Sequence, residues 1–80
     1  MTPDTVQVGP WRLHWSRWRE FPSAPAIYGR WLACRSDHDR LYESRAVLTQ
    51  AEMTRAPELR DVAREAAYTR LLDTINEVTA

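Results

Sequence analysis

The amino-acid sequence predicts a small α+β protein in which an antiparallel three-stranded sheet packs against a C-terminal helix. Segments before residue 49 alternate apolar and polar side chains at the period of a β-strand. Residues 58–78 contain strong helix formers and neither Gly nor Pro. A chain of 80 residues has room for one hydrophobic core, so we expect a single domain over residues 1–80.

The first strand is expected over about residues 6–18. At a period of two residues, Trp11, Leu13 and Trp15 share one face. At a period of 3.6 residues, Trp11, Trp15 and Trp18 share a stripe instead, so periodicity alone leaves a helix open. The alternation of TVQV just upstream and the preference of Trp for strands favour the strand. Pro10, which suits the first turn of a helix, favours the alternative.

Two more strands are expected over about residues 26–35 and 40–48. The segment AIYGRWLACR is apolar on both faces, which is typical of a central strand covered on both sides. The polar residues SDHD at 36–39 predict a turn. In the strand that follows the turn, Tyr42, Ala46 and Leu48 share one face.

Two helices complete the predicted fold. Thr49 and Glu52 have the spacing of a capping box, which predicts a short helix over about residues 50–55. A longer helix is expected over about residues 57–77. The alternative fold is a small all-α bundle in which Pro10, Pro25 and Pro57 each begin a helix. The scarcity of Ile and Val in the chain supports that alternative.

The apolar residues of the long helix fall into two clusters on opposite sides. On a helical wheel one cluster comprises Leu59, Val62, Ala63 and Ala66, and the other comprises Tyr68, Leu71, Leu72, Ile75 and Val78. We expect the larger, second cluster to face the core. Leu59 and Val62 would then form an outer surface, although the reverse assignment stays open. Loops could also cover the outer cluster, or it could contact a partner.

Charge is balanced over the whole chain but not along it. The eleven basic residues are all arginine and are matched by eleven acidic residues. Residues 1–35 carry a net charge of +3 and residues 36–80 a net charge of −3, an asymmetry that steers association with charged partners. The sequence has no signal peptide and no apolar run near the roughly 20 residues that cross a bilayer. We therefore expect a cytoplasmic protein without a membrane partner.

Catalytic and metal-binding motifs are weak. Cys34, Asp37, His38 and Asp39 lie close in sequence, but their spacing matches no paired zinc signature. Cys34 is more simply a small buried apolar residue. Two glycines cannot form a Gly-rich phosphate loop. We therefore expect no catalytic residue, no metal and no cofactor.

Protein binding is the function that the composition favours. Interfaces are enriched in Trp, Tyr, Met and Arg and depleted in Lys, and this chain has that bias. We expect a non-catalytic module that binds another protein or a protein–nucleic acid complex, or that forms a homodimer. In size and character it is similar to phage-type inhibitors of host complexes, such as anti-CRISPR proteins. The expected partner-binding residues are Arg12, Arg17, Trp18, Arg19, Leu59 and Val62.

The alternative function is that of a single-stranded nucleic-acid-binding accessory protein. Arg and Trp interleave over residues 11–19 and again over residues 30–35, and bases stack on such side chains. The zero net charge and the absence of RNP or KH motifs make direct nucleic-acid binding the less favoured hypothesis.

Overall fold

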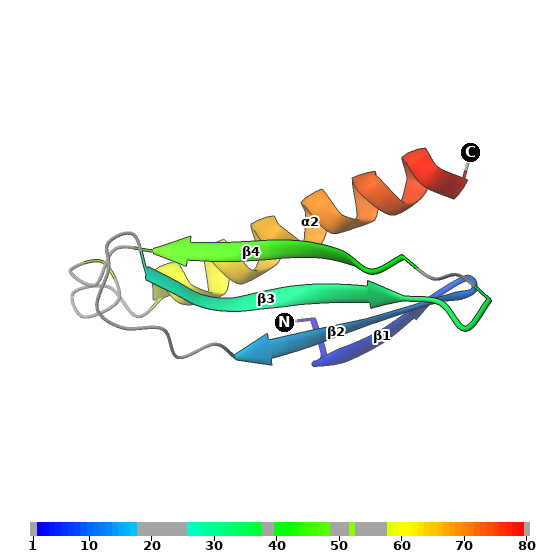
Figure 1. Cartoon of the computed structure of the whole chain (residues 1–80). Coiled ribbons are helices and arrows are strands. Elements are labelled where there is room, and N and C mark those ends of the chain that lie inside the picture. Colours follow the sequence, from blue (N-terminus) through cyan, green and yellow to red (C-terminus); the bar gives the residue numbers. More distant parts are fainter. Residues whose placement is uncertain (1, 18–25, 38–39, 49–51, 53–57, 80) are drawn as a thin grey trace.

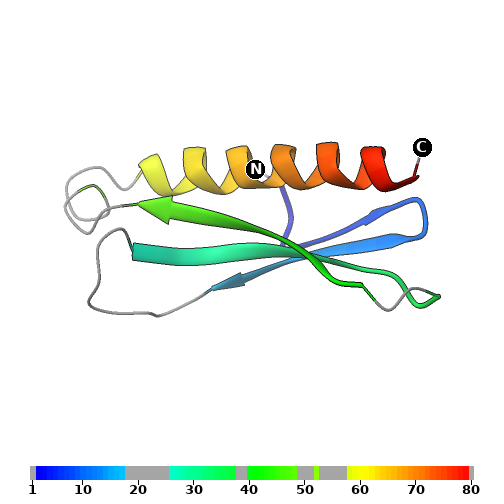
Figure 2. The same cartoon turned by 45° about the horizontal axis from the view of Figure 1, so that its top comes forward.

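The computed structural model describes residues 2–17, 26–37, 40–48, 52 and 58–79. These residues form four strands, β1 (Thr5–Val8), β2 (Trp11–Arg17), β3 (Ala26–Cys34) and β4 (Tyr42–Leu48), followed by the long helix α2 (Glu58–Thr79). The strands are antiparallel in the order β1-β2-β3-β4, and α2 covers one face of the sheet (Figure 1, Figure 2). The predicted α+β class is therefore confirmed.

The predicted number of strands is wrong. The segment expected as one strand over residues 6–18 is a hairpin of β1 and β2, joined by Gly9 and Pro10. Gly9 has a φ of 57°, a conformation that glycine adopts without steric cost. Pro10 fixes its own φ near −65°, so the pair fits a type II′ turn, which joins strands through two residues. Pro10 therefore ends a turn and does not begin a helix.

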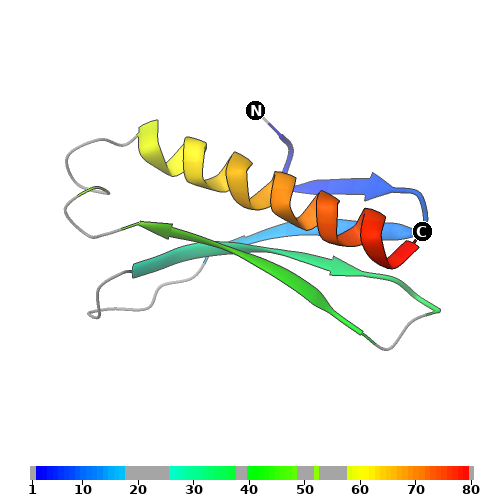
Figure 3. The same cartoon turned by 90° about the horizontal axis from the view of Figure 1, so that it is seen from above.

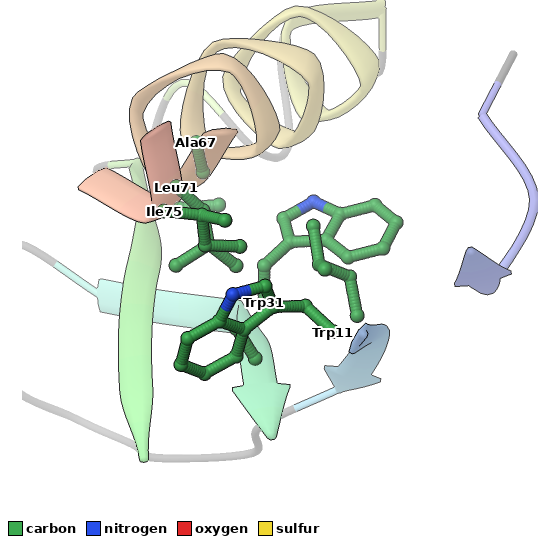
Figure 4. Close-up of a cluster of buried hydrophobic side chains, with 8 residues drawn as sticks. Trp11, Trp31, Ala67, Leu71 and Ile75 are labelled. Carbon is green, nitrogen blue, oxygen red and sulfur yellow. The ribbon is translucent and has the colours of Figure 1, made fainter. Parts of the chain in front are cut away.

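The hydrophobic core lies between α2 and one face of the sheet. Alternate residues of the strands point into it, as the period of two predicts for β2 and β4. Figure 4 shows Trp11 and Trp31 from the sheet beside the α2 side chains. The buried members of this cluster are Trp11, Leu13, Trp31, Ala33, Ala46, Ala67, Leu71 and Ile75.

Helix α2 buries a single stripe that drifts around its axis. It packs chiefly on β4 and β3 and runs in the opposite direction to β4 (Figure 3). Each step of four residues turns the stripe by about 40°, which lets a straight helix follow a twisted sheet. Of the cluster expected on the outside, Val62 and Ala66 are exposed, whereas Ala63 packs against the core. Of the cluster expected in the core, Leu71 and Ile75 are buried and Val78 is exposed. The fully buried residues of the stripe are spaced four apart: Ala67, Leu71 and Ile75.

The prediction that β3 is covered on both faces is wrong for the described part of the chain. β3 is central because β2 and β4 flank it, yet α2 covers only one of its faces. Leu32 and Cys34 lie half-buried on the other face, where the neighbouring strands shield their sides. Apart from Glu52, the short helix expected over residues 50–55 lies outside the described residues.

Candidate partner-binding surface

The three described tryptophans belong to the face that α2 covers. Trp11 and Trp31 are buried, and Trp15 is half-buried. The Trp15 indole lies directly over Gly29 on the neighbouring strand, and its ring centroid is 5.6 Å from that of Trp31. A base that stacked on Trp11 or Trp31 would first have to displace the helix.

The guanidinium of Arg64 in α2 lies over two of these tryptophans, whose rings also contact each other. Its guanidinium carbon lies 5.1 Å from the Trp15 ring centroid and 5.2 Å from that of Trp31. The indole Nε1 of Trp31 donates a hydrogen bond of 3.0 Å to the backbone oxygen of Arg64. Since cation–π attraction strengthens when the cation is desolvated, these contacts stabilise the packing of α2 on the sheet. This arginine is thus part of the core and not of a binding surface.

The N-terminal arm is tied to the same part of the helix. Arg64 Nη2 donates to the backbone oxygen of Thr2 at 2.7 Å and to Asp4 Oδ1 at 2.8 Å. The hydroxyl and the backbone N–H of Thr2 both donate to the carboxylate of Glu65. The bond from the Thr2 hydroxyl is the main cause that lowers the pKa of Glu65 below its usual value. The arm therefore closes the β1 side of the helix–sheet interface.

The opposite face of the sheet is open, because no described element covers it. We call it the open face. Its side chains form rows across the strands, as the register of the sheet dictates. Three such rows are Thr5–His14–Leu32–Glu43, Gln7–Arg12–Cys34 and Ser16–Arg30–Arg45.

Two arginines and one glutamate form a network on the open face. Arg30 Nη1 donates to Glu43 Oε2 at 2.8 Å, and Arg45 Nε donates to Glu43 Oε1 at 2.9 Å. The bond from Arg30 is the largest cause that lowers the pKa of Glu43. Glu43 thus accepts hydrogen bonds from both guanidinium groups next to Leu32, its register partner on β3.

Charge is separated between the two sides of the molecule. Among the described residues of the strands, the open face carries Arg12, Arg30 and Arg45 against the acid Glu43. Helix α2, on the other side, carries five acidic residues against three arginines. A neutral chain thus presents a positive face and a negative face, which is a finer separation than the +3 and −3 halves of the sequence indicated.

One corner of the open face contains the Cys34 region that the sequence suggested for metal binding. A shallow pocket of about 360 Å³ lies there, lined by Arg12, Cys34 and Arg35 among others. The Cys34 thiol donates to the backbone oxygen of Arg12, and Asp37 binds the guanidinium of Arg35. His38 and Asp39 lie outside the described residues. Among the described residues, no three His, Cys, Asp or Glu side chains gather so that they could hold a metal ion.

The structure places the predicted partner-binding residues in different regions. Arg12 is exposed on the open face. Arg17 is exposed at the end of β2, and it lies with its register partner Gly29 on the face that α2 covers. Val62 is exposed on α2 and Leu59 is half-buried near the start of that helix. Trp18 and Arg19 lie outside the described residues. The described members of the set therefore do not form one surface.

The sequence analysis did not single out Leu32 and Arg45 of the open face, and it offered Arg30 only as part of the Arg–Trp pattern of residues 30–35. These three residues surround Glu43, and each lies on a strand. The alternation of β4 did contain a signal, since it puts Glu43 and Arg45 on the face opposite Ala46 and Leu48. The positions of Arg30 and Leu32 could not be predicted in the same way, because β3 is apolar on both faces.

The described residues define a small α+β protein with one helix on one face of the sheet and an arginine-rich open face on the other. No protein-family model, no curated protein and no solved structure matches the chain. None of the described helices is both long and apolar enough to cross a membrane.

Proposed function

We propose that the chain is a non-catalytic protein-binding module that captures an acidic protein surface on its open face. The observation that carries the proposal is the network in which Glu43 fixes Arg30 and Arg45 beside Leu32. Arginine side chains held in place around an apolar residue resemble the energetic centre of a protein interface, where Arg is enriched. A module of this kind acts stoichiometrically, as an inhibitor or modulator of a larger complex.

The electrostatics of the open face favour an acidic partner. Its positive side chains attract a negative surface and speed the encounter, whereas the acidic outer side of α2 repels that surface and so orients the approach. Because the guanidinium groups of Arg30 and Arg45 are already positioned by Glu43, binding would immobilise little additional side-chain freedom.

Protein is favoured over single-stranded nucleic acid because of the tryptophans. Binding to single strands relies on aromatic side chains on which the bases stack. Trp11 and Trp31 lie under α2, and the open-face side chains in the described rows include no tryptophan. Arginines that bind phosphate would still give affinity, but of a kind that falls steeply with salt.

The test compares two charge reversals on the same strand. Arg12→Glu changes the open face, and Arg17→Glu makes the same change on an exposed side chain of the opposite face. Wild type and both variants would be immobilised and exposed to a nuclease-treated lysate of the organism that encodes the chain. We expect a protein that binds wild type and Arg17→Glu in stoichiometric amount but is lost with Arg12→Glu.

Two outcomes would overturn the proposal. If Arg12→Glu and Arg17→Glu retain the same proteins, the open face is not the binding surface. If the wild-type complex disappears after nuclease treatment or follows a steep salt dependence, the arginines bind phosphate and the nucleic-acid hypothesis replaces ours. Circular dichroism of both variants would establish that each is folded.

A further inference from the structure

Strand β4 forms one edge of the sheet, and no described strand pairs with its outer side. Edge strands present backbone N–H and C=O groups to any chain that can pair with them, and proteins commonly protect them with Pro, charged side chains or very short strands. β1, at the other edge, has four residues, whereas β4 has seven, contains no Pro, and carries charges of both signs in Glu43 and Arg45. A shallow groove of about 380 Å³ follows this edge, lined by Glu43, Ser44, Arg45, Arg70 and Thr74.

One hydrogen bond shows which backbone groups point outward from β4. Arg70 Nη2 donates to the backbone oxygen of Arg45 at 2.9 Å from the groove side of the strand. A carbonyl that a helix side chain reaches from this side points away from β3. Since backbone groups alternate in direction along a strand, those of Glu43 and Val47 point outward as well. These residues would form the hydrogen-bonded pairs with an added strand.

The side chains select one register for a second copy of β4. Two identical antiparallel strands pair about a twofold axis, so one residue faces itself. An axis at Glu43 or at Arg45 sets like charges directly opposite each other, which destabilises the pair. An axis at Ser44 sets Glu43 opposite Arg45 of the second copy, twice, and keeps the outward-pointing backbone groups facing each other.

The same register pairs the apolar residues that β4 leaves exposed. Leu41, directly before the strand, is 65% exposed, and Val47 is 41% exposed on the open face. With the axis at Ser44, Leu41 of each copy lies opposite Val47 of the other. On the covered face, Tyr42 lies opposite Ala46 of the second copy. The Glu43–Arg45 pairs of this register are thus complementary in charge, and the Leu41–Val47 pairs are apolar on both sides.

We propose that two copies of this chain pair through β4, antiparallel and about Ser44, and so join their sheets into one of eight strands. When the dimer forms, the hydrogen bond from the Arg70 guanidinium to the backbone oxygen of Arg45 breaks. The backbone N–H of Glu43 in the second copy then donates to that oxygen. Each Glu43–Arg45 pair exchanges two backbone hydrogen bonds, about four in all. The inference shares Glu43 and Arg45 with the proposed function, but it concerns pairing along the edge of the sheet, and its test measures self-association instead of capture of another protein.

The helix flank above this edge agrees with the proposal. At 100° per residue, Leu59 and Ala66 lie within about 40° of Arg70 on the helical wheel. This flank therefore faces the side of the molecule on which the second copy would sit. Leu59 is half-buried and Ala66 is exposed, so the helices of two copies could approach each other over the β4 seam.

Charge reversals at the edge test the pairing. Glu43→Arg places an arginine opposite Arg45 of the second copy, and Arg45→Glu places a glutamate opposite Glu43. Each variant alone should self-associate at least about tenfold more weakly than wild type in sedimentation equilibrium. An equimolar mixture of the two variants should regain dimers, because each reversed residue then faces an opposite charge. Arg12→Glu, an equal charge change two strands from the edge, should leave self-association unchanged.

Cysteine cross-linking tests the register separately from the affinity. In a Cys34→Ser background, Ser44→Cys would place two thiols opposite each other, at a Cα separation of about 4.5 Å that a disulfide can span. Glu43→Cys is the control, since its two copies would lie about 7 Å or more apart on the diagonal. We expect oxidation to give a covalent dimer with Ser44→Cys and little with Glu43→Cys.

The proposal is overturned if wild type stays monomeric up to about 1 mM. It is also overturned if the mixture of Glu43→Arg and Arg45→Glu chains associates no better than either alone. Cross-linking that is equal at residues 43 and 44 would contradict the register. Loss of self-association in Arg12→Glu, with the edge variants unaffected, would move the contact to the open face.

Discussion

Replacing Gly29 by alanine should destabilise the protein, although propensity alone predicts the opposite. Gly29 lies within β3, and glycine in a strand costs roughly 0.5–1 kcal/mol relative to alanine through chain entropy. The structure predicts the opposite sign for the change in stability on Gly29→Ala. A Cβ at this position would lie 2.2 Å from Cζ2 and 2.5 Å from Cη2 of Trp15.

The magnitude follows from how little the Trp15 ring can move. Carbon atoms pack at about 3.5–4.0 Å, so the ring would have to shift by more than about 1 Å. Trp31 and the guanidinium of Arg64 already lie against it, at centroid distances of 5.6 and 5.1 Å. An added methyl group in such a setting costs about 1–3 kcal/mol, and a displaced indole also loses part of its cation–π contact.

Thermal unfolding followed by far-ultraviolet circular dichroism would measure this change in stability. A loss of about 2 kcal/mol corresponds to a fall of roughly 8–16 °C in Tm for a domain of this size. Trp15→Leu removes the obstructing ring, so Gly29→Ala should be neutral or stabilising in that background. A Gly29→Ala protein as stable as wild type would refute the close packing of Trp15 on β3.

Three further perturbations probe the core and the arm. Leu71→Ala should cost about 2–5 kcal/mol in denaturant unfolding, because Leu71 is 1% exposed, while Val62→Ala should change stability by less than about 0.5 kcal/mol. Arg64→Lys should lower stability by about 1–2 kcal/mol, since an ammonium group cannot stack on the two indoles as the planar guanidinium does, and a calorimetric Tm equal to that of wild type would contradict this. The lowered pKa of Glu65 contributes stability above its usual value of 4.5 that is lost as pH falls through the lowered value, so Glu65→Gln should flatten acid unfolding profiles below pH 5 or thereabouts.

Local chemistry allowed the sequence to predict the class of fold and most of its elements. The long helix was expected over residues 57–77 and spans Glu58–Thr79, because it depends on propensity within one segment. The β1–β2 hairpin was missed although Gly9–Pro10 is a turn signal between two alternating segments. The period-two pattern of the tryptophans indicates a single long strand, whereas the Gly9–Pro10 pair indicates a turn, and the turn is what the structure contains.

The open-face network could not be predicted because it depends on strand register. Arg30 and Glu43 are 13 residues apart, and they meet only because Leu32 pairs with Glu43 and Arg30 with Arg45. Arg64 is 33 residues from Trp31 and 49 from Trp15 in the sequence, and it contacts both rings only because of how α2 docks on the sheet. Sequence patterns report which residues share a face, whereas such contacts require the relative placement of elements.

The location of the exposed apolar residues bears directly on the need for a partner. The sequence predicted apolar contacts with a partner at Trp18, Leu59 and Val62. Trp18 lies outside the described residues, Leu59 is half-buried and Val62 is exposed, while Trp11 and Trp31 are buried by the chain itself. The large apolar residues found exposed in the described part of the chain are Leu41, Val47, Val62 and Val78. Leu41 and Val47 flank Glu43 and Arg45, where backbone groups also point outward. A second β4 strand would cover both residues and satisfy those groups at once, whereas contacts on α2 would cover only the two isolated valines. The β4 edge is therefore the surface on which self-association should be tested first.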